Sequence, residues 1–424
     1  MEPRSVLSVD EIALGLPEFW TRPLEEREGA FATLRRERPV SFHQEPYIES
    51  LPFPRGPGFW SLTRHADILE ASRKPEIFCS GKGSNIGDLP EPFLEFFGSM
   101  INMDDPRHAR LRRIVSAAFT PRVLQQVEDD VRRAAREIVD SVIEKGECDF
   151  VTDVAARLPL QIICNLMGIP ASQHDLIFER TNVILGAGDP EYVPDPSQIV
   201  PKLLRSGAEL AQLVQELGRE RRKNPTRDLT SALVNATVDG ESLNDSELGS
   251  FFVLLVVAGN ETTRNAISHG VKALHDHPEQ KAIWQADFER VAPTAVEEIV
   301  RWATPVIHFR RTATCDTEIG GQAIREGEKV VLWYCSGNRD EAVFDDPFRF
   351  DVRRQPNPHV AFGGPGPHYC LGAHLARREI TVMFRELLGR IPDLEVVGEP
   401  DRLQSFFIHG LKHMPVRFTP GGAS

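Results

Sequence analysis

The chain has 424 residues, with 49 lysine and arginine against 62 aspartate and glutamate side chains, and a formal net charge of −13. Hydrophobic residues make up 41% and charged residues 26%, a globular balance that excludes a wholly disordered chain. The acidic balance argues against nucleic acid as the main partner, because binding to phosphates needs a basic surface.

The apolar runs and the cysteines argue against a membrane span, a disulfide scaffold and a structural zinc site. The longest apolar run, 251–259, is far shorter than the roughly 20 residues that cross a bilayer, and the N-terminal sequence lacks the pattern of a secretory signal. The six cysteines include no C-x-x-C pair. We therefore expect a cytoplasmic protein with no membrane span, and nothing in the sequence requires more than a monomer.

Three parts of the chain differ in pattern, and we expect them to form one domain over residues 1–424. Residues 1 to about 100 mix short helices with strand-like pieces, and residues 101 to about 305 carry apolar side chains at helical spacing. Residues 306–424 combine β-rich stretches with a long coil and one more helix. The predicted fold class is therefore mainly α with small β regions.

An arginine-rich helix is predicted to begin near Asp105. His108 and Arg112 are four residues apart, so both side chains project from one face of this helix. The less favoured alternative for this segment alone is a solvated basic helix.

The most informative helix is predicted from Asn244 to about Asp276. Asn244 and Glu247 have the spacing of a capping box, and the centre of the helix is apolar on every side, which indicates burial. That centre contains the sequence 259–263, Gly-Asn-Glu-Thr-Thr. A buried glycine and carboxylate are costly in a helix, so helix propensity does not explain them; a kink around a buried water is the structural alternative.

Beyond this helix, Glu298 and Arg301 are spaced to share one helix face. A hairpin is predicted around Gly320 and Gly321, followed by a strand over 329–334. The coil over 338–367 is long for a compact domain, and long ordered coils are often functional.

A lone cysteine, Cys370, lies in the glycine-rich segment 362–372, directly before a predicted helix. The helix N-terminus and nearby backbone amides favour a thiolate at such a position. A rigidly held thiolate can bind haem iron and donate electron density that favours O–O cleavage. The simpler alternative is a buried cysteine in a glycine loop.

This segment resembles the haem-binding signature of the cytochrome P450 family, the haem-thiolate monooxygenases. Gly366, His368, Cys370 and Gly372 match the signature, whereas Phe362 lies eight residues before the cysteine instead of seven. The resemblance implies the cytochrome P450 fold, a haem b cofactor (iron protoporphyrin IX), Cys370 as the metal ligand, and Phe362 beside the sulfur.

The resemblance also implies roles for other segments. Four residues would bind the two haem propionates: His108, Arg112, Arg311 and His368. Thr262 would be the hydroxyl donor and Glu261 the acid of a catalytic pair that delivers protons, with Ala258 beside the haem. Thr263 is the weaker candidate for the hydroxyl. A structural triad of Glu298, Arg301 and Arg349 would brace the cysteine loop.

By position in the family, several separated stretches line the substrate pocket. The residues expected there are Phe97, Ile101, Ile184, Leu254, Val257, Ala258, Val306 and Phe407. No arginine or lysine falls in these stretches, so a long apolar substrate fits better than a polar one. An anionic group would have to lie near the pocket mouth.

Longer segments, including 181–186, 251–265 and 292–302, look like an actinobacterial branch of the family that hydroxylates methyl-branched lipids at the chain terminus. The extra residue of the cysteine loop looks more like relatives that oxidise the cholesterol side chain, so a cholestenone hydroxylase remains an alternative. The resemblance implies dioxygen as co-substrate and electrons from NAD(P)H through a ferredoxin reductase and a ferredoxin.

Two other interpretations, a non-catalytic haem protein and a second kind of enzyme, are weaker. A non-catalytic haem-thiolate sensor or lipid carrier would not need the pair Glu261 and Thr262. A peroxide-driven hydroxylase typically replaces that pair with an arginine next to a proline, and this chain keeps the pair.

Overall fold

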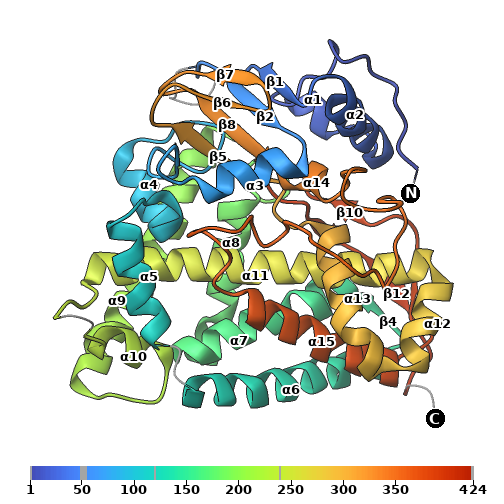
Figure 1. Ribbon diagram of the computed structural model, residues 1–424. Coiled ribbons are helices and arrows are strands. Elements are labelled where there is room, and N and C mark those ends of the chain that lie inside the picture. The colour runs from blue at the N-terminus through green and yellow to red at the C-terminus, as the bar shows by residue number, and fades with distance from the viewer. Residues whose placement is uncertain (1, 48–54, 119–120, 238–239, 422–424) are drawn as a thin grey trace.

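The computed structural model describes residues 2–47, 55–118, 121–237 and 240–421 (Figure 1). The first elements alternate helix and strand: α1 (Pro17–Trp20), α2 (Leu24–Glu37), β1 (Val40–His43), β2 (Phe59–Leu62), α3 (His65–Arg73), β3 (Phe78–Cys79), α4 (Glu91–Gly98) and η1 (Ser99–Asn102). The middle of the chain is helical apart from one short strand: α5 (Arg107–Ala118), α6 (Pro121–Ile143), β4 (Glu147–Asp149), η2 (Val151–Ala155), α7 (Arg157–Met167), η3 (Ala171–Gln173), α8 (His174–Leu185), η4 (Pro196–Gln198), α9 (Ile199–Lys223), α10 (Leu229–Asn235), α11 (Asp245–Asp276), α12 (Pro278–Ala286) and α13 (Phe288–Ala303).

The last part returns to strands on both sides of one long helix: β5 (His308–Ala313), β6 (Thr317–Ile319), β7 (Gln322–Ile324), β8 (Lys329–Trp333), α14 (Tyr334–Gly337), α15 (Ala373–Arg390), β9 (Glu395–Val396), β10 (Asp401–Arg402), β11 (Leu411–His413) and β12 (Pro415–Arg417). The prediction of a mainly helical fold with small β regions is confirmed. None of the helices in the described ranges is long and apolar enough to cross a membrane.

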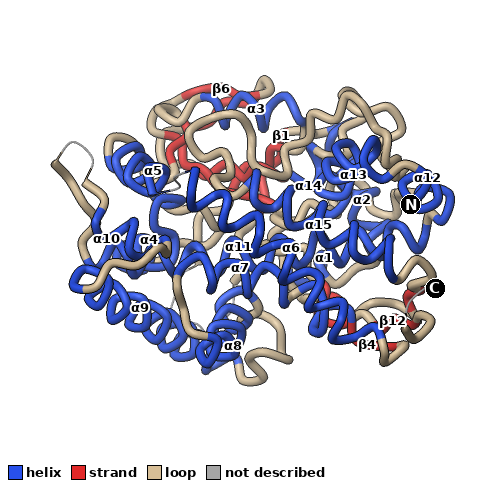
Figure 2. The backbone as a smooth tube through the Cα atoms, turned by 90° about the horizontal axis from the view of Figure 1, so that it is seen from below, coloured by secondary structure: helices blue, strands red, loops and turns tan. Residues whose placement is uncertain are grey.

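Helix α11 crosses the molecule from side to side (Figure 1). The predicted capping box at its start is confirmed: the Asn244 amide oxygen accepts from the Glu247 N–H at 2.9 Å, and the Glu247 carboxylate accepts from the Asn244 N–H at 3.0 Å. Helices α7, α9, α13 and α15 pack against α11. Helix α15 packs against both α11 and α6 (Figure 2).

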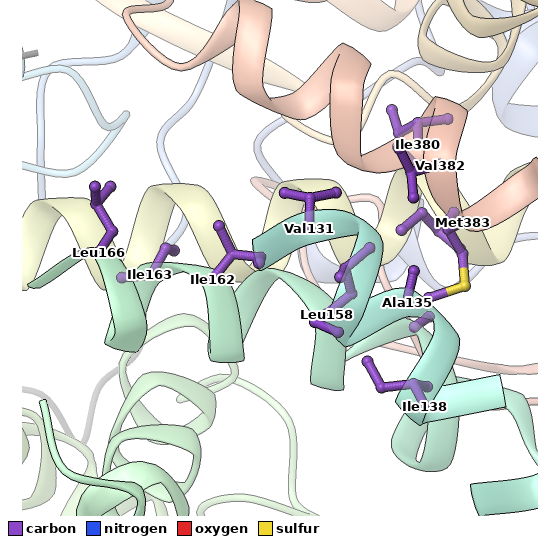
Figure 3. Close-up of a cluster of buried hydrophobic side chains, with 14 of the residues drawn as sticks. Val131, Ala135, Ile138, Leu158, Ile162, Ile163, Leu166, Ile380, Val382 and Met383 are labelled. Atoms are coloured by element: carbon purple, nitrogen blue, oxygen red, sulfur yellow. The ribbon is translucent and has the colours of Figure 1, made fainter. Parts of the chain in front are cut away.

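The main hydrophobic core lies between these helices, and Figure 3 shows part of it. Three helices supply the labelled side chains: Val131, Ala135 and Ile138 from α6, Leu158, Ile162, Ile163 and Leu166 from α7, and Ile380, Val382 and Met383 from α15. Because α15 begins directly after the cysteine loop, this packing fixes the position of that loop.

The largest sheet has the strand order β1-β2-β8-β5-β3, with β2 and β8 parallel and the other pairs antiparallel. It lies above α11 in Figure 1, together with α1 and α2. The predicted hairpin is confirmed, since β6 pairs with β7 and the glycines between them have φ of +57° and +80°. These values favour glycine.

Strand pairing joins segments that are distant in the chain. Strand β2 pairs with β8, and β4 pairs with β12. The single domain over residues 1–424, with parts that change at about 100 and 305, remains a prediction.

Candidate functional site

The cysteine loop is held by backbone hydrogen bonds and by a close approach to α3. The Cys370 N–H donates to the Phe362 carbonyl oxygen at 3.0 Å, and the Ala373 N–H donates to the Cys370 carbonyl oxygen at 3.4 Å. Gly366 has φ of +153°, and a Cβ there would lie 2.3 Å from the Ser72 carbonyl oxygen. Only glycine fits this contact, which accounts for one residue of the predicted signature.

Cys370 keeps accessible surface at the mouth of α15. Burial of the thiol raises its pKa, while the Gly372 N–H and the charges of Arg112 and Arg377 act in the opposite direction. In the protein by itself, burial thus outweighs the backbone amide and the two arginines. A bound metal cation overcomes this, because a coordinating thiol is deprotonated.

Four predicted cofactor-binding residues meet beside this loop. The ring centroids of His108 and His368 are 4.3 Å apart. Arg112 donates to the Tyr369 carbonyl oxygen at 2.8 Å, and Arg311 lines a small hollow with His368. Burial, followed by the positive charge of Arg311, lowers the pKa of His368 to about 3.

This cluster lacks the negative charge needed to balance it. Among the described residues, neither Arg112 nor Arg311 forms an ion pair with a carboxylate; His108 has Asp105 at 3.4 Å on Nδ1. The buried Nε2 of His108 has no hydrogen-bond partner. The cluster therefore fits a ligand that brings its own carboxylates.

The centre of α11 combines an open face with a buried ion pair. Ala258 is exposed and Thr262 half-buried, whereas Glu261 is 1% exposed. The Thr262 hydroxyl donates to the Ala258 carbonyl oxygen at 2.6 Å. The partly exposed face of α11 thus carries the predicted Thr262 hydroxyl, whereas Glu261 lies on the buried face.

Glu261 has partners that sequence reasoning missed. Its Oε1 accepts from the Arg264 guanidinium and, at 3.4 Å, from the Asn265 amide, while its buried Oε2 has no partner. Arg264 also donates to the Asn182 side chain at 3.0 Å. The signal was available in the spacing, since Arg264 follows Glu261 by three residues.

Glu298 and Arg301 form a fully buried ion pair at 2.8 Å. Arg301 also donates to the carbonyl oxygens of Asn338 and Pro347, at 2.8 and 2.9 Å, and thereby holds the coil that leads to the cysteine loop. The predicted pair is brought together as expected.

The assignment of Arg349 to this triad is wrong. Its side chain is 58% exposed, 3.9 Å from Asp351, and only its backbone carbonyl oxygen faces Arg301. Arg354 takes the third position: its side chain is 9% exposed, and its Nε donates to Glu298 at 3.2 Å. The turn over 349–354 points the Arg349 side chain toward solvent and the Arg354 side chain toward the buried Glu298.

Comparisons with known proteins agree over the whole chain. Residues 205–392 match the family model described as Cytochrome P450. A methyl-branched lipid omega-hydroxylase of Mycobacterium tuberculosis is 51% identical over 420 residues, which are 98% of this chain and 97% of that protein. The chain belongs to the cytochrome P450 family.

Two further relatives extend the comparison. A steroid C26-monooxygenase of Mycolicibacterium smegmatis is 43% identical over 371 residues, 86% of this chain and 84% of that one. The structure of a Mycobacterium marinum cytochrome P450 in complex with pseudoionone has a TM-score of 0.92 and 46% identity, covering 98% of this chain and 100% of that chain.

The protein is therefore a cytochrome P450 monooxygenase, and membership of the family implies a haem cofactor. The residues present fit that group. The unbalanced cluster of His108, Arg112, Arg311 and His368 suits its two propionates, and the free, exposed Cys370 would be its sulfur ligand.

In this cytochrome P450, the expected substrate-lining side chains come from distant segments. Phe97, Ile101, Ile184 and Val257 are partly buried against the main core, whereas Leu254 is 9% exposed and belongs to the core itself. Val306 and Phe407 lie on adjoining segments: the Ile307 N–H donates to the Phe407 carbonyl oxygen at 2.8 Å. Their roles toward a substrate remain predictions.

Phe362 is turned toward α15. The Arg377 guanidinium lies 4.4 Å from its ring centroid, and Arg377 also donates to Glu297 at 3.0 Å. A cation–π contact therefore holds the ring at the start of α15.

Proposed function

We propose that this cytochrome P450 hydroxylates a long apolar lipid, a methyl-branched fatty acid or isoprenoid, at or near the chain terminus. The observation that carries the proposal is the 51% identity, over nearly the full length of both chains, to an enzyme named methyl-branched lipid omega-hydroxylase. The apolar character of the expected pocket residues supports it, since an alkyl chain binds by burial of apolar surface.

A bound haem would supply the oxidising chemistry, and a thiolate ligand would favour O–O cleavage. Cys370 would provide that thiolate, and the four-residue cluster around His108 and His368 would hold the group through its carboxylates. The protein's remaining task is to position the lipid and to deliver protons.

Thr262 and Glu261 are the residues that we assign to proton delivery. The Thr262 hydroxyl lies on the half-buried face of α11, and its proton is held by the Ala258 carbonyl oxygen. Oε1 of Glu261 is occupied by Arg264, whereas the buried Oε2 has no partner, so Oε2 is the oxygen that we assign to proton exchange through a water. A carrier or sensor would not need this pair.

Electrons are expected from NAD(P)H through a ferredoxin reductase and a ferredoxin. The arginine-rich surface formed by α5 and the start of α15 is the proposed docking face. Arg107, Arg110, Arg377 and Arg378 on it are paired with Glu95, Glu247, Glu297 and Glu128. An acidic ferredoxin would therefore have to compete with these ion pairs, and the association should weaken with added salt.

The test is product analysis. Holoenzyme supplied with NADPH, a ferredoxin reductase, a ferredoxin and labelled dioxygen should convert a methyl-branched fatty acid into the terminal alcohol, with one labelled oxygen per product. Cholest-4-en-3-one, supplied in parallel, tests the steroid alternative that the 43% identical steroid C26-monooxygenase favours. Absence of product from the fatty acid, with turnover of the steroid, would reject the proposal.

A further inference from the structure

Helices α13 and α15 pack against each other (Figure 1), and an ion pair joins them beside the cysteine loop. The Arg377 guanidinium of α15 donates to the Glu297 carboxylate of α13 through Nε and, at 3.0 Å, through Nη2. His359 Nε2 lies 2.9 Å from the same carboxylate. The Arg377 and Glu297 side chains are only 28% and 26% exposed, so water screens this pair less than a pair on the open surface.

Arg377 contacts two aromatic side chains of the cysteine loop. Its guanidinium carbon lies 4.4 Å from the ring centroid of Phe362, and its Nη2 donates to the Tyr369 hydroxyl at 3.5 Å. The Phe362 carbonyl oxygen accepts from the Cys370 N–H at 3.0 Å, and Tyr369 directly precedes Cys370. Arg377 itself is only one turn into the helix that begins after this loop. A positive charge therefore lies against both residues that hold the cysteine.

Both members of the pair are ionised in the folded protein. Burial would raise the pKa of Glu297, but hydrogen bonds from His359 and Arg377 lower it to about 2. The hydrogen bond to Glu297 raises the pKa of Arg377. The pair thus places its cation in contact with the cysteine loop and its anion on α13.

We propose that Arg377 is a positioning residue of the haem site, which holds Phe362 and raises the reduction potential of the bound iron, and that Glu297 limits this effect. The inference rests on Cys370 as the proposed iron ligand. A reduced ferredoxin gives one electron to the ferric iron; the ferredoxin is oxidised, the iron becomes ferrous, and the site gains one negative charge. A nearby cation stabilises this more negative state, and a nearby anion destabilises it.

The same two helices carry a second pair of the same kind, farther from the cysteine loop. Arg385 of α15 donates to Glu289 of α13 at 2.9 Å, and its guanidinium carbon lies 5.1 Å from the ring centroid of Phe288. Arg385 follows Arg377 by eight residues, which is about 12 Å along a helix. Variants of this second pair therefore control for a general effect on the packing of α13 against α15.

The test is spectroelectrochemical titration of the holoenzyme, with the midpoint potential of the haem as the readout. Arg377→Met should lower the equilibrium constant for one-electron reduction about threefold or more, roughly 28 mV at about 59 mV per tenfold. Glu297→Gln should raise the potential, because it leaves the guanidinium unbalanced, and the double variant should return toward the parent. Arg377→Lys, which keeps the charge, should shift the potential less than Arg377→Met. Arg385→Met and Glu289→Gln should leave it unchanged.

Three results would overturn the proposal. Shifts of Arg377→Met and Glu297→Gln in the same direction would mean that the pair only keeps the loop ordered. Unchanged potentials in both variants would mean that solvent screens their charges. A shift in Arg385→Met as large as that in Arg377→Met would mean a general effect of helix packing.

The ferrous carbon monoxide spectrum of the parent separates this inference from the proposed ligand. A spectrum without the band of a thiolate-bound haem would reject Cys370 as the ligand, and the inference with it. A thiolate band together with equal potentials in the parent and all variants would reject the inference alone.

Discussion

Glu261 and Arg264 form an ion pair within the centre of α11, with side chains only 1% and 4% exposed. The pair explains how a carboxylate can lie in an apolar helix. It also occupies one oxygen of the acid that we assign to proton delivery and leaves the other without a partner.

Replacing Arg264 by methionine should destabilise the protein by about 3 kcal/mol or more, because it leaves the Glu261 carboxylate buried without its counter-charge. The double variant Glu261→Gln/Arg264→Met should regain much of this loss. Urea unfolding of the three proteins measures the effect. Equal stability of the single and double variants would mean that the ion pair does not hold Glu261 in place.

Thr262→Ala should uncouple electron use from product formation, because the variant lacks the hydroxyl on the open face of α11. We expect product per NADPH consumed to fall by about tenfold or more, with peroxide released instead, since a positioned proton-transfer group contributes roughly 10²–10⁴-fold in rate. Thr263→Ala is the control, since that side chain is buried. Uncoupling by Thr263→Ala alone would transfer the role to Thr263.

Arg354→Met should lower stability by about 1–3 kcal/mol and loosen the coil before the cysteine loop, since it removes a charged hydrogen bond to buried Glu298. Arg349→Met, at the exposed position, should change stability by about 0.5 kcal/mol or less. Denaturant unfolding and haem retention compare the two. A larger effect at Arg349 would contradict the triad described above.

The buried carboxyl of Glu379 in α15 should make the stability of the protein depend on pH. Burial raises the pKa of this carboxyl to about 8, above its ordinary value of 4.5, so the folded protein retains a proton that the unfolded chain loses. The free energy of unfolding therefore falls as pH rises from about 4.5 to about 8, because Glu379 ionises in the unfolded chain and stays protonated in the folded protein.

Glu379→Gln should consequently gain stability relative to the parent, by about 3 kcal/mol at pH 7 and little at pH 4.5. Urea unfolding at both pH values measures this difference. Glu386→Gln on the same helix removes a partly buried carboxylate that is paired with Arg390, and serves as the control. If the free energies of unfolding of the parent and of the Glu379→Gln variant changed in parallel with pH, Glu379 would be ionised in the folded protein.

Local signals in the sequence predicted much of the fold and site. The capping box at Asn244 and the apolar centre of α11 are properties of one segment, and so the helix was predicted within a residue or two of its ends. The glycine-rich loop predicted Cys370, and the family resemblance connected it to His108 and Arg112, which do meet His368 in space.

Contacts that depend on how coils pack were not predictable in this way. Arg349 and Arg354 both precede the cysteine loop, and only the turn between them decides which side chain reaches Glu298. A cavity of about 320 Å³ is lined by residues of α2, α11, α13 and α14 together with Arg402 and His409, and no single one of these segments shows any sign of it.

Optical titration of the purified holoenzyme shows whether the protein is a haem-thiolate enzyme for a methyl-branched lipid. We expect a methyl-branched fatty acid to shift the haem Soret band toward the high-spin position, saturably and at lower concentration than cholest-4-en-3-one. Tighter binding of the steroid would contradict the substrate class. A haem band that neither lipid shifts would contradict the lipid pocket itself, and a protein that takes up no haem would contradict the role of Cys370.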